Sequence, residues 1–480
     1  MTPRRDNYIA GGWRSAAEYL PNINPAVPTQ VIAEHAQASR EQAAEAIAAA
    51  RSAARAWAES GIQQRFDVLD FVGSELLKRR EDLGELLARE EGKTRAEAIA
   101  EVARAGQIFK FFAGEAVRAH GESLASVRPG IEVTVTREPM GVVGVITPWN
   151  FPIAIPAWKV APALACGNCV LLKPAAPAPA CSWALAEILS RSGLPPGVFN
   201  LVNGAGSVVG DALVRSEGVD AISFTGSQAT GAGILATASA RGAKVQLEMG
   251  GKNPLIVLAD ADLSVAVECA VQGAFYSTGQ RCTASSVLIV DDAVHDAFVA
   301  ALAERTRTLV VGDPLEPHTN IGPVVDAQQL QGNLRYARLA VEEGGEMVEG
   351  GHAVEMASGG YFMRPGLVTG TDRSMTVNCE EIFGPLASVI RVRGYDEALA
   401  TANDTPFGLS SGICTRSLKH AHHFRRHAAA GMVMVNLPTA GVDYHVPFGG
   451  RKASSYGPRE QGSYAREFFT TVKTAYVRPL

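Results

Sequence analysis

The stretch GVVGVITPWNFPIAIPAWKVAPALACGNCVLLKP, residues 141–174, decides the class of fold. It begins with one short, nearly all-apolar run and ends with another, and a segment of helical length lies between them. Such runs are typical of strands buried on both faces of a parallel sheet, because helices cover both sides of these sheets. The stretch therefore predicts two buried parallel strands joined by a helix.

The same alternation continues on both sides of this stretch. Further β-rich runs are VFNLVNG, AISFTG, KVQLEMGG and NPLIVL, followed later by SSVLIVDD and SVIRVR. Helices are expected over 39–60, about 63–118 with a break at Gly92, 262–275, 293–309, 327–344 and 396–402. Strands that alternate with helices predict an α/β fold with two doubly wound domains.

The bulk composition excludes several classes of protein. A chain of 480 residues is too long for a single core, and a net charge of −5 gives no electrostatic footprint for nucleic acid or an anionic membrane. The most apolar region, about 151–172, contains Lys159 and three prolines, so no membrane span is expected. The N-terminus has no apolar stretch typical of a signal peptide, and seven irregularly spaced cysteines favour a reducing compartment. These features predict a cytoplasmic protein.

Two glycine-containing stretches resemble phosphate-binding loops without matching them. Gly92-Lys93-Thr94 lacks the earlier glycine of a P-loop, because Leu87 stands at that position. The segment 204–210 follows a predicted strand, but its third glycine comes one residue late for a dinucleotide fingerprint. Neither stretch alone predicts a nucleotide site.

Two possible metal sites are also interpreted as structural. Cys166 and Cys169 have the spacing of a metal or redox pair, but no second pair follows and their neighbours are apolar, which favours buried thiols. His423 and His427 stand one helical turn apart without an accompanying carboxylate motif, which favours a solvated helix face. No metal is expected.

Four polar positions at predicted strand ends and turns carry the candidate chemistry. Asn150 follows an apolar strand, and Glu248 ends another directly before two glycines. Cys282 lies in YSTGQRCTAS with almost no apolar neighbours, and EEIFGP places Glu381 and Phe383 on a turn. Taken singly, these residues also have simpler explanations: Asn150 could be a turn residue, Glu248 a solvated charge and Cys282 a packed thiol. Together they lie where α/β proteins bind ligands.

The motifs TPWNFP, LEMGGKNP, GQRCTA, EEIFGP and PFGGRKAS resemble those of the NAD(P)-dependent aldehyde dehydrogenase superfamily, in order and in approximate spacing, over essentially the whole chain. This resemblance implies irreversible oxidation of an aldehyde through a thiohemiacetal and a thioester on Cys282, with Glu248 as the general base. The amide of Asn150 and the N–H of Cys282 would hold the oxyanion. Lys159 and Glu460 match positions that relay protons from the base.

The resemblance also implies a site for NAD⁺ or NADP⁺. The expected cofactor residues are Ile146, Thr147, Pro148, Trp149, Lys173, Ala175, Ala176, Gly206, Gly210, Phe224, Thr225, Gly226, Ser227, Thr230, Met249, Gly250, Glu381 and Phe383. One of them departs from the pattern of NAD-preferring members, which commonly carry a glutamate at the position of Ala176. A carboxylate there would repel a 2′-phosphate, so its absence predicts that NADP⁺ is accepted or even preferred.

The segment 436–479 is most similar to α-ketoglutaric semialdehyde (2,5-dioxopentanoate) dehydrogenases. Such a substrate carries a carboxylate opposite its aldehyde, and Arg281 is the expected cation that binds it. Phe151 and Trp158 are expected to line the substrate tunnel, and Trp158 stands where succinic semialdehyde enzymes often carry arginine. Succinic or glutaric semialdehyde, or a broad range of aldehydes, remains the alternative.

The family resemblance divides the chain into three parts. Residues 1–121 and 140–250 would form the cofactor domain, 251–440 the catalytic domain, and 122–139 with 441–480 an oligomerisation and bridging segment. Polar and apolar residues alternate along 122–139 and along the strand near the C-terminus, as in a β ribbon. These segments would pair between subunits in a dimer or a dimer of dimers. The rival classes are a cofactor-independent thiol esterase or acyltransferase and a non-catalytic scaffold.

Overall fold

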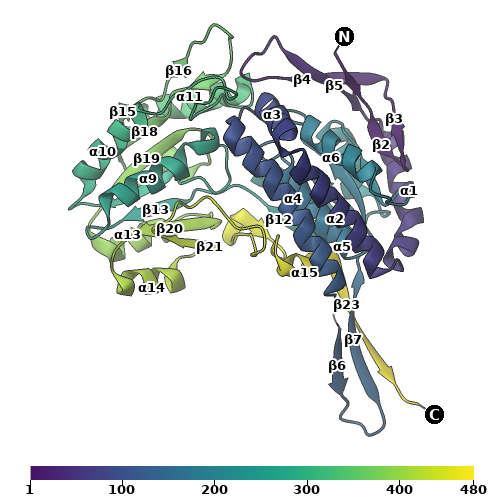
Figure 1. Cartoon of the computed structure of the whole chain (residues 1–480). Coiled ribbons are helices and arrows are strands. Elements are labelled where there is room, and N and C mark those ends of the chain that lie inside the picture. The colour runs from purple at the N-terminus through teal and green to yellow at the C-terminus, as the bar shows by residue number, and fades with distance from the viewer. Residues whose placement is uncertain (1, 120, 480) are drawn as a thin grey trace.

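The computed structural model describes residues 2–119 and 121–479. Two α/β lobes lie side by side, and a narrow β ribbon projects from the first of them (Figure 1). Each lobe is built on one large, mostly parallel sheet, so the predicted α/β class with two doubly wound sheets is confirmed.

The first lobe contains an eight-stranded sheet. Its five central strands are parallel, and strands from the two ends of the chain extend it at the edges. In spatial order the strands are β22 (Ser455–Tyr456), β12 (Lys244–Glu248), β11 (Ala221–Thr225), β8 (Val142–Ile146), β9 (Cys169–Lys173), β10 (Phe199–Leu201), β2 (Asn7–Ile9) and β3 (Gly12–Arg14). Every residue of β8, β9 and β11 is buried, as their continuous apolar runs predict.

Helices cover both faces of this sheet. They are α1 (Arg40–Ala58), α2 (Ile62–Lys78), α3 (Arg80–Glu91), α4 (Arg95–Val117), α5 (Ala154–Ala165), α6 (Ala180–Ser190), the π-helix η1 (Gly206–Gly210), α7 (Asp211–Arg215) and α8 (Gln228–Ala240). Ser39 and Gln42 form the predicted capping box of α1. The helical block after it is broken at Gly92 as predicted, where φ is 95°, and it is also interrupted at Arg79.

The second lobe contains a seven-stranded sheet that is parallel except at β15. Its spatial order is β15 (Glu346–Glu349), β18 (Gly366–Thr371), β19 (Leu386–Val392), β14 (Val287–Asp291), β13 (Pro254–Val257), β20 (Ser410–Cys414) and β21 (Met432–Val435). The helices of this lobe are α9 (Leu263–Ala274), the 3₁₀-helix η2 (Tyr276–Gly279), α10 (His295–Arg307), α11 (Ala327–Glu342), α12 (Thr376–Cys379), α13 (Gly394–Asn403) and α14 (Leu418–His427).

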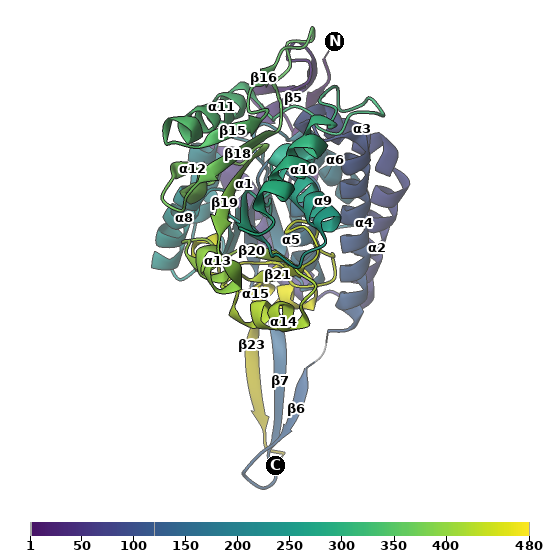
Figure 2. The same cartoon turned by 90° about the vertical axis from the view of Figure 1, so that its left-hand side faces the viewer.

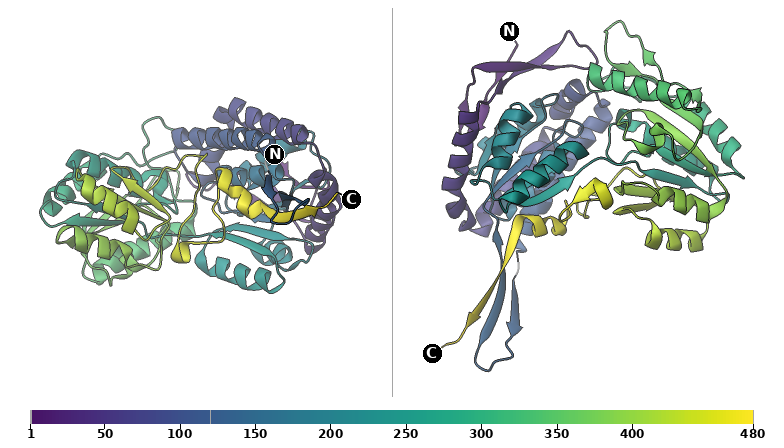
Figure 3. Two further views of the ribbon diagram at one scale, coloured as in Figure 1. Left: turned by 90° about the horizontal axis from the view of Figure 1, so that it is seen from below. Right: turned by 180° about the vertical axis from the view of Figure 1, so that it is seen from behind.

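The ribbon is a separate three-stranded sheet. It consists of β6 (Glu122–Ala125), β7 (Glu132–Pro139) and β23 (Thr470–Val477), and it extends away from both lobes (Figure 2). The C-terminal segment passes between the lobes before it enters the ribbon (Figure 3). On the way it supplies β22, the short helices η3 (Lys452–Ser454) and η4 (Ser463–Ala465), and α15 (Arg466–Phe469). Residues 441–479 therefore contribute to the first sheet as well as to the ribbon.

Small peripheral sheets complete the fold. Strands β1 (Arg4–Arg5), β5 (Val31–Gln37) and β4 (Glu18–Ile23) form one, and β16 (Ala353–Val354) pairs with β17 (Phe362–Met363). Within residues 2–119 and 121–479, no three metal-ligating side chains gather, and no helix has the length and apolarity needed to cross a bilayer. Cys169 is buried as predicted, whereas Cys166 is half-buried.

Candidate active site

The loop that carries Cys282 joins η2 to β14 and has a constrained backbone. Ser277 and Thr278 adopt left-handed conformations, with φ of 52° and 55°. Gly279 follows with φ of 66°, and a Cβ there would lie 2.2 Å from the carbonyl oxygen of Gly384. Left-handed non-glycine residues persist only where their surroundings hold them. Here Glu97 accepts hydrogen bonds from both the N–H and the hydroxyl of Ser277, at 2.8 and 3.1 Å.

Cys282 itself is half-buried, and its backbone is fixed from the neighbouring strand. The amide of Asn253 donates to the carbonyls of Cys282 and Ala284, at 2.8 and 2.9 Å. Burial raises the pKa of the Cys282 thiol, and the charges of Glu381 and Glu248 raise it further. The raised pKa keeps the proton on this thiol near neutral pH.

Glu248 is the last residue of β12 and lies almost fully buried. The hydroxyl of Ser455 donates to its Oε2 at 2.5 Å, while Oε1 has no hydrogen-bond partner among the described residues. Burial, followed by the charge of Glu460, raises the pKa of Glu248 well above its ordinary value. A carboxyl in this state can exchange protons near neutral pH, which suits general acid–base chemistry.

A buried ion pair lies beside this carboxyl. Lys159 of α5 pairs with Glu460, and its ammonium also donates to the hydroxyl of Ser223 at 2.8 Å. The indole N–H of Trp158 donates to the second oxygen of Glu460 at 2.7 Å. Because the charges of Glu460 and Lys159 both act on the pKa of Glu248, the predicted base and relay residues form one electrostatic unit.

Asn150 lies buried against the loop of Cys282. Its side-chain amide donates to the carbonyl of Gln280 at 2.9 Å. An amide nitrogen carries two hydrogens, so one donor is left for another acceptor. The Asn150 backbone carbonyl accepts a hydrogen bond from the buried ammonium of Lys93, which also pairs with Glu101 at 2.8 Å. The structure thus brings Asn150, Glu248 and Cys282 into one region.

A cavity of about 560 Å³ lies at the ends of the first-lobe strands. Six of the expected cofactor residues line it: Ile146, Lys173, Gly206, Gly210, Phe224 and Thr230. The Lys173 ammonium donates to the carbonyl of Pro174 at 2.9 Å, and burial lowers the pKa of Lys173 to about 8. A Cβ at Gly210 would lie 3.8 Å from the Lys173 side chain, so the absent side chain leaves room beside the cation.

The other expected cofactor residues lie outside this cavity. They are Thr147, Pro148, Trp149, Ala175, Ala176, Thr225, Gly226, Ser227, Met249, Gly250, Glu381 and Phe383. The hydroxyls of Thr147 and Thr225, at the ends of β8 and β11, are buried without a hydrogen-bond partner among the described residues. Such orphaned polar groups fit a polar ligand beside these strand ends.

Glu381 and Phe383 are expected cofactor residues that come from the second lobe. It accepts a hydrogen bond from the N–H of Gly251 at 3.0 Å, and burial raises the pKa of its carboxyl to about 7. Trp149 packs edge-to-face on Phe383, with the ring centroids 5.4 Å apart. A Cβ at Gly250 would lie 1.8 Å from the carboxylate of Glu381, so only glycine allows this approach. Together with the cavity, these groups fit a dinucleotide.

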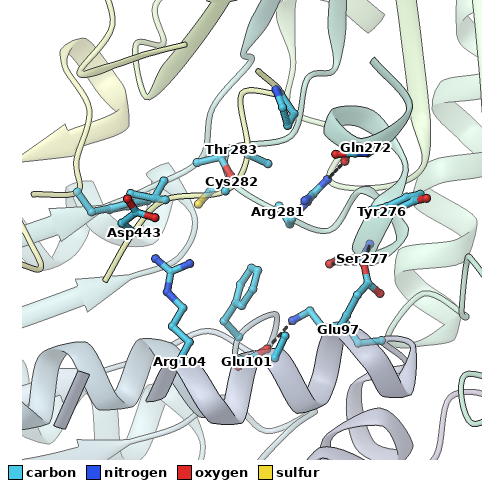
Figure 4. Close-up of a pocket in the computed structure, with 18 of the residues that line it drawn as sticks. Glu97, Glu101, Arg104, Gln272, Tyr276, Ser277, Arg281, Cys282, Thr283 and Asp443 are labelled. Carbon is cyan, nitrogen blue, oxygen red and sulfur yellow. Dashed lines mark hydrogen bonds and ion pairs between the residues drawn. The ribbon is translucent and has the colours of Figure 1, made fainter. Parts of the chain in front are cut away.

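A second cavity, of about 640 Å³, lies on the other side of Cys282 (Figure 4). The expected substrate residues Phe151, Trp158 and Arg281 all line it. The guanidinium of Arg281, however, donates to the carbonyls of Gln272 and Gly273 at the end of α9. Two backbone acceptors therefore already bind the cation that the sequence suggests for a substrate carboxylate.

The model of the aldehyde dehydrogenase family matches residues 13–475. The chain belongs to the aldehyde dehydrogenase family. The predicted NAD(P)-dependent aldehyde dehydrogenase is therefore confirmed at the level of the family, and the rival classes of scaffold and cofactor-independent thiol enzyme lose their basis.

Individual relatives agree over the full length. An α-ketoglutaric semialdehyde dehydrogenase of Bacillus subtilis is 41% identical over 477 residues, covering 98% of each chain. An α-ketoglutarate semialdehyde dehydrogenase of Haloferax volcanii is 42% identical over 481 residues, covering 99% of each. The crystal structure of a betaine aldehyde dehydrogenase of Staphylococcus aureus in complex with NAD⁺ has a TM-score of 0.96 at 32% identity, covering 99% of this chain and 95% of that one.

Several residues that support this aldehyde dehydrogenase site were not predicted. Asn253, Gln280 and Ser455 hold Cys282, Asn150 and Glu248 respectively. Two of them lie within the motifs LEMGGKNP and GQRCTA, and the third directly follows PFGGRKAS, so a signal for them was present. Arg104 of α4 lines the cavity beside Cys282 but stands in no motif, and only the fold brings it there.

Proposed function

We propose that the enzyme oxidises α-ketoglutaric semialdehyde (2,5-dioxopentanoate) to α-ketoglutarate, with NAD⁺ or NADP⁺ as the cofactor. The observation that carries this proposal is the Cys282 thiol on the wall of a cavity that is also lined by three cationic side chains, the buried Lys93 and the half-buried Arg104 and Arg281. A substrate with an aldehyde at one end and a carboxylate at the other needs both features. The names of the two semialdehyde dehydrogenases described above support the same substrate.

In the proposed reaction the Cys282 thiol first loses its proton to water in the adjoining cavity, and the thiolate then attacks the aldehyde carbon and forms a tetrahedral thiohemiacetal. The N–H of Cys282 and the free amide hydrogen of Asn150 hold the oxyanion. A nicotinamide, when bound, supplies an acceptor for the hydride that leaves this carbon. The ends of β8 and β11 and the carboxylate of Glu381 orient the cofactor in this proposal.

The second half of the reaction releases the acid. Glu248 takes a proton from water, and the resulting hydroxide attacks the thioester carbon and expels the Cys282 thiolate. The buried position of Glu248 keeps its pKa high enough to accept this proton near neutral pH. The pair of Lys159 and Glu460 passes the proton onward and limits the charge that accumulates beside the base.

A panel of aldehydes tests the substrate. We expect dioxopentanoate to give the highest kcat/KM when it is compared with succinic semialdehyde, glutaric semialdehyde and simple alkanals of similar length. Formation of reduced cofactor, measured by its near-ultraviolet absorbance, reports the reaction. A higher kcat/KM for an uncharged alkanal would contradict the proposal, and ester hydrolysis without any cofactor reduction would favour the thiol-enzyme alternative.

Replacing Asn150 with alanine tests the oxyanion site. We expect kcat for aldehyde oxidation to fall by about 100- to 1,000-fold, because a preorganised donor stabilises charge that develops only in the transition state. The KM should change little. Ser192→Ala provides the control: it removes a half-buried hydroxyl whose one partner among the described residues is the carbonyl of Leu189, so it should leave kcat unchanged. Ser455→Ala would not serve, because Ser455 bonds the base.

The cofactor preference is a separate prediction. Ala176 is exposed and offers no carboxylate to a 2′-phosphate, so we expect NADP⁺ to be used with a kcat/KM near or above that of NAD⁺. Ala176→Glu should shift the ratio toward NAD⁺ by about tenfold or more, through repulsion of the phosphate. A preference of the unmodified enzyme for NAD⁺ above about 100-fold would contradict this assignment.

The ribbon suggests how subunits assemble. Its exposed apolar side chains include Leu124, Val472, Tyr476 and Val477. We propose that ribbons pair between subunits in a dimer or a dimer of dimers, and that the three-part division into cofactor, catalytic and bridging segments holds. The seven free cysteines are consistent with a reducing, cytoplasmic location.

A further inference from the structure

The substrate cavity is lined by six charged side chains, and they differ in the partners that already bind them. Lys93 is paired with Glu101 and donates to the carbonyl of Asn150. Glu97 is committed to Ser277 and to the start of α4. Arg281 donates to backbone carbonyls at the end of α9. Among the described residues only Lys93 and Glu101 of these six form an ion pair, and Arg104 and Asp443 bond neither a charged side chain nor the backbone.

Arg104 projects from α4 toward the loop of Cys282, across the cavity (Figure 4). Its Nε is buried and has no hydrogen-bond partner among the described residues. Its one hydrogen bond there runs from Nη2 to the neutral side-chain oxygen of Gln461, at 3.3 Å. The Nε of Arg281 is also buried without a partner there, but that guanidinium has two backbone acceptors. Arg104 is half-buried and has one neutral acceptor, and a buried donor is costly unless an acceptor joins it, so this position fits an anionic ligand.

The geometry points to Arg104 as the residue that binds the substrate carboxylate. This inference rests on the proposed function. The planar guanidinium offers paired N–H donors to both oxygens of a carboxylate, which an ammonium cannot match. Gln461 holds one edge of the group, and the ring of Trp158 lies 5.9 Å from it, so its orientation is supported from the protein side.

Two carboxylates act on the charge of Arg104. Burial lowers the pKa of Arg104, and the charges of Glu101 and then of Asp443 oppose this shift. Glu101 is already paired with Lys93, whereas Asp443 lies exposed on the opposite wall. Water screens an exposed carboxylate, so its attraction for Arg104 is weaker than that of a carboxylate bound inside the cavity. Asp443 would also repel an incoming anion, and its removal should strengthen substrate binding.

The test compares two substrates that differ in the carboxylate end. Arg104→Met keeps a long apolar stem, and we expect it to raise KM for dioxopentanoate by about 100-fold while KM for pentanal stays within about threefold. Arg104→Lys should recover part of the loss because it restores the charge but not the planar pair of donors. Asp443→Asn should lower KM for dioxopentanoate and leave pentanal unaffected.

Arg281→Met provides the matched control. It removes the other arginine of the cavity, and it should change the kinetics of both substrates to the same extent, since its guanidinium bonds the backbone. Turnover of pentanal by each variant shows that the protein is folded. Selectivity for dioxopentanoate that survives Arg104→Met but is lost in Arg281→Met would overturn the assignment.

The outcomes also separate this inference from the proposed function. If the unmodified enzyme shows no preference for dioxopentanoate over pentanal, the proposed substrate is wrong. If that preference exists and Arg104→Met retains it, the substrate stands and the role of Arg104 is wrong. A preference for an aminoaldehyde that Asp443→Asn abolishes would overturn both, because the cavity would then bind a cation.

Discussion

Replacing Cys282 with alanine is expected to lower kcat for aldehyde oxidation by about 10⁵-fold or more, since no other group can form the covalent intermediate. The side chain is small and half-buried, so its loss should leave the fold intact. Among the described cysteines, Cys282 alone lines the substrate cavity. Steady-state and single-turnover measurements of reduced cofactor should both show the loss.

A matched control separates chemistry from packing in this experiment. Cys166 is also half-buried, and burial raises the pKa of its thiol to about 12, but it lies at the end of α5, outside the substrate cavity. Cys166→Ala should keep kcat within about twofold. Binding of the oxidised cofactor should survive in both variants. Substantial single-turnover oxidation by Cys282→Ala would contradict the nucleophile role.

The fold was predictable from sequence where burial is continuous. Strands β8, β9 and β11 are buried on both faces, so their apolar runs identify them without knowledge of their neighbours. The order of the strands in each sheet could not be predicted in this way, because it depends on crossover connections that no local sequence pattern records. The break at Arg79 also escaped prediction, since neither glycine nor proline marks it.

The site was predictable where motifs carry it and not where distant segments meet. Glu248 and Cys282 stand in motifs, so their importance is visible in the sequence. Arg104 reads as an ordinary polar position within a helix, and its bond to Gln461 joins residues 357 apart. Arg281 illustrates the converse: its place beside the nucleophile suggests a substrate contact, but the end of α9 supplies nearer acceptors.

Replacing Glu248 with glutamine is expected to lower steady-state kcat by about 1,000-fold while one equivalent of reduced cofactor still forms rapidly in the first turnover. Glutamine keeps the shape and the hydrogen bond from Ser455 but cannot accept a proton from water. Hydride loss precedes this step, so the thioester on Cys282 should accumulate. Rapid-mixing measurements of the burst and mass spectrometry of the acylated protein detect it.

The pH profile gives an independent check on the same residue. Burial and Glu460 raise the pKa of Glu248, so its protonated, inactive form persists to higher pH than for an exposed glutamate. Thioester hydrolysis should therefore slow by about tenfold for each pH unit below that raised pKa and level off above it. Glu248→Gln should remove this dependence from the deacylation rate, because the titrating group is gone.

An added nucleophile distinguishes a lost base from a disturbed site. Hydroxylamine carries its own lone pair and attacks the thioester without a base, forming a hydroxamate and releasing the Cys282 thiolate. Turnover of Glu248→Gln should therefore recover with hydroxylamine, whereas that of Cys282→Ala should not. If the burst of Glu248→Gln disappears together with its steady-state rate, Glu248 acts before hydride loss. In that case its buried carboxyl serves the thiol of Cys282, whose pKa is also raised, rather than the water.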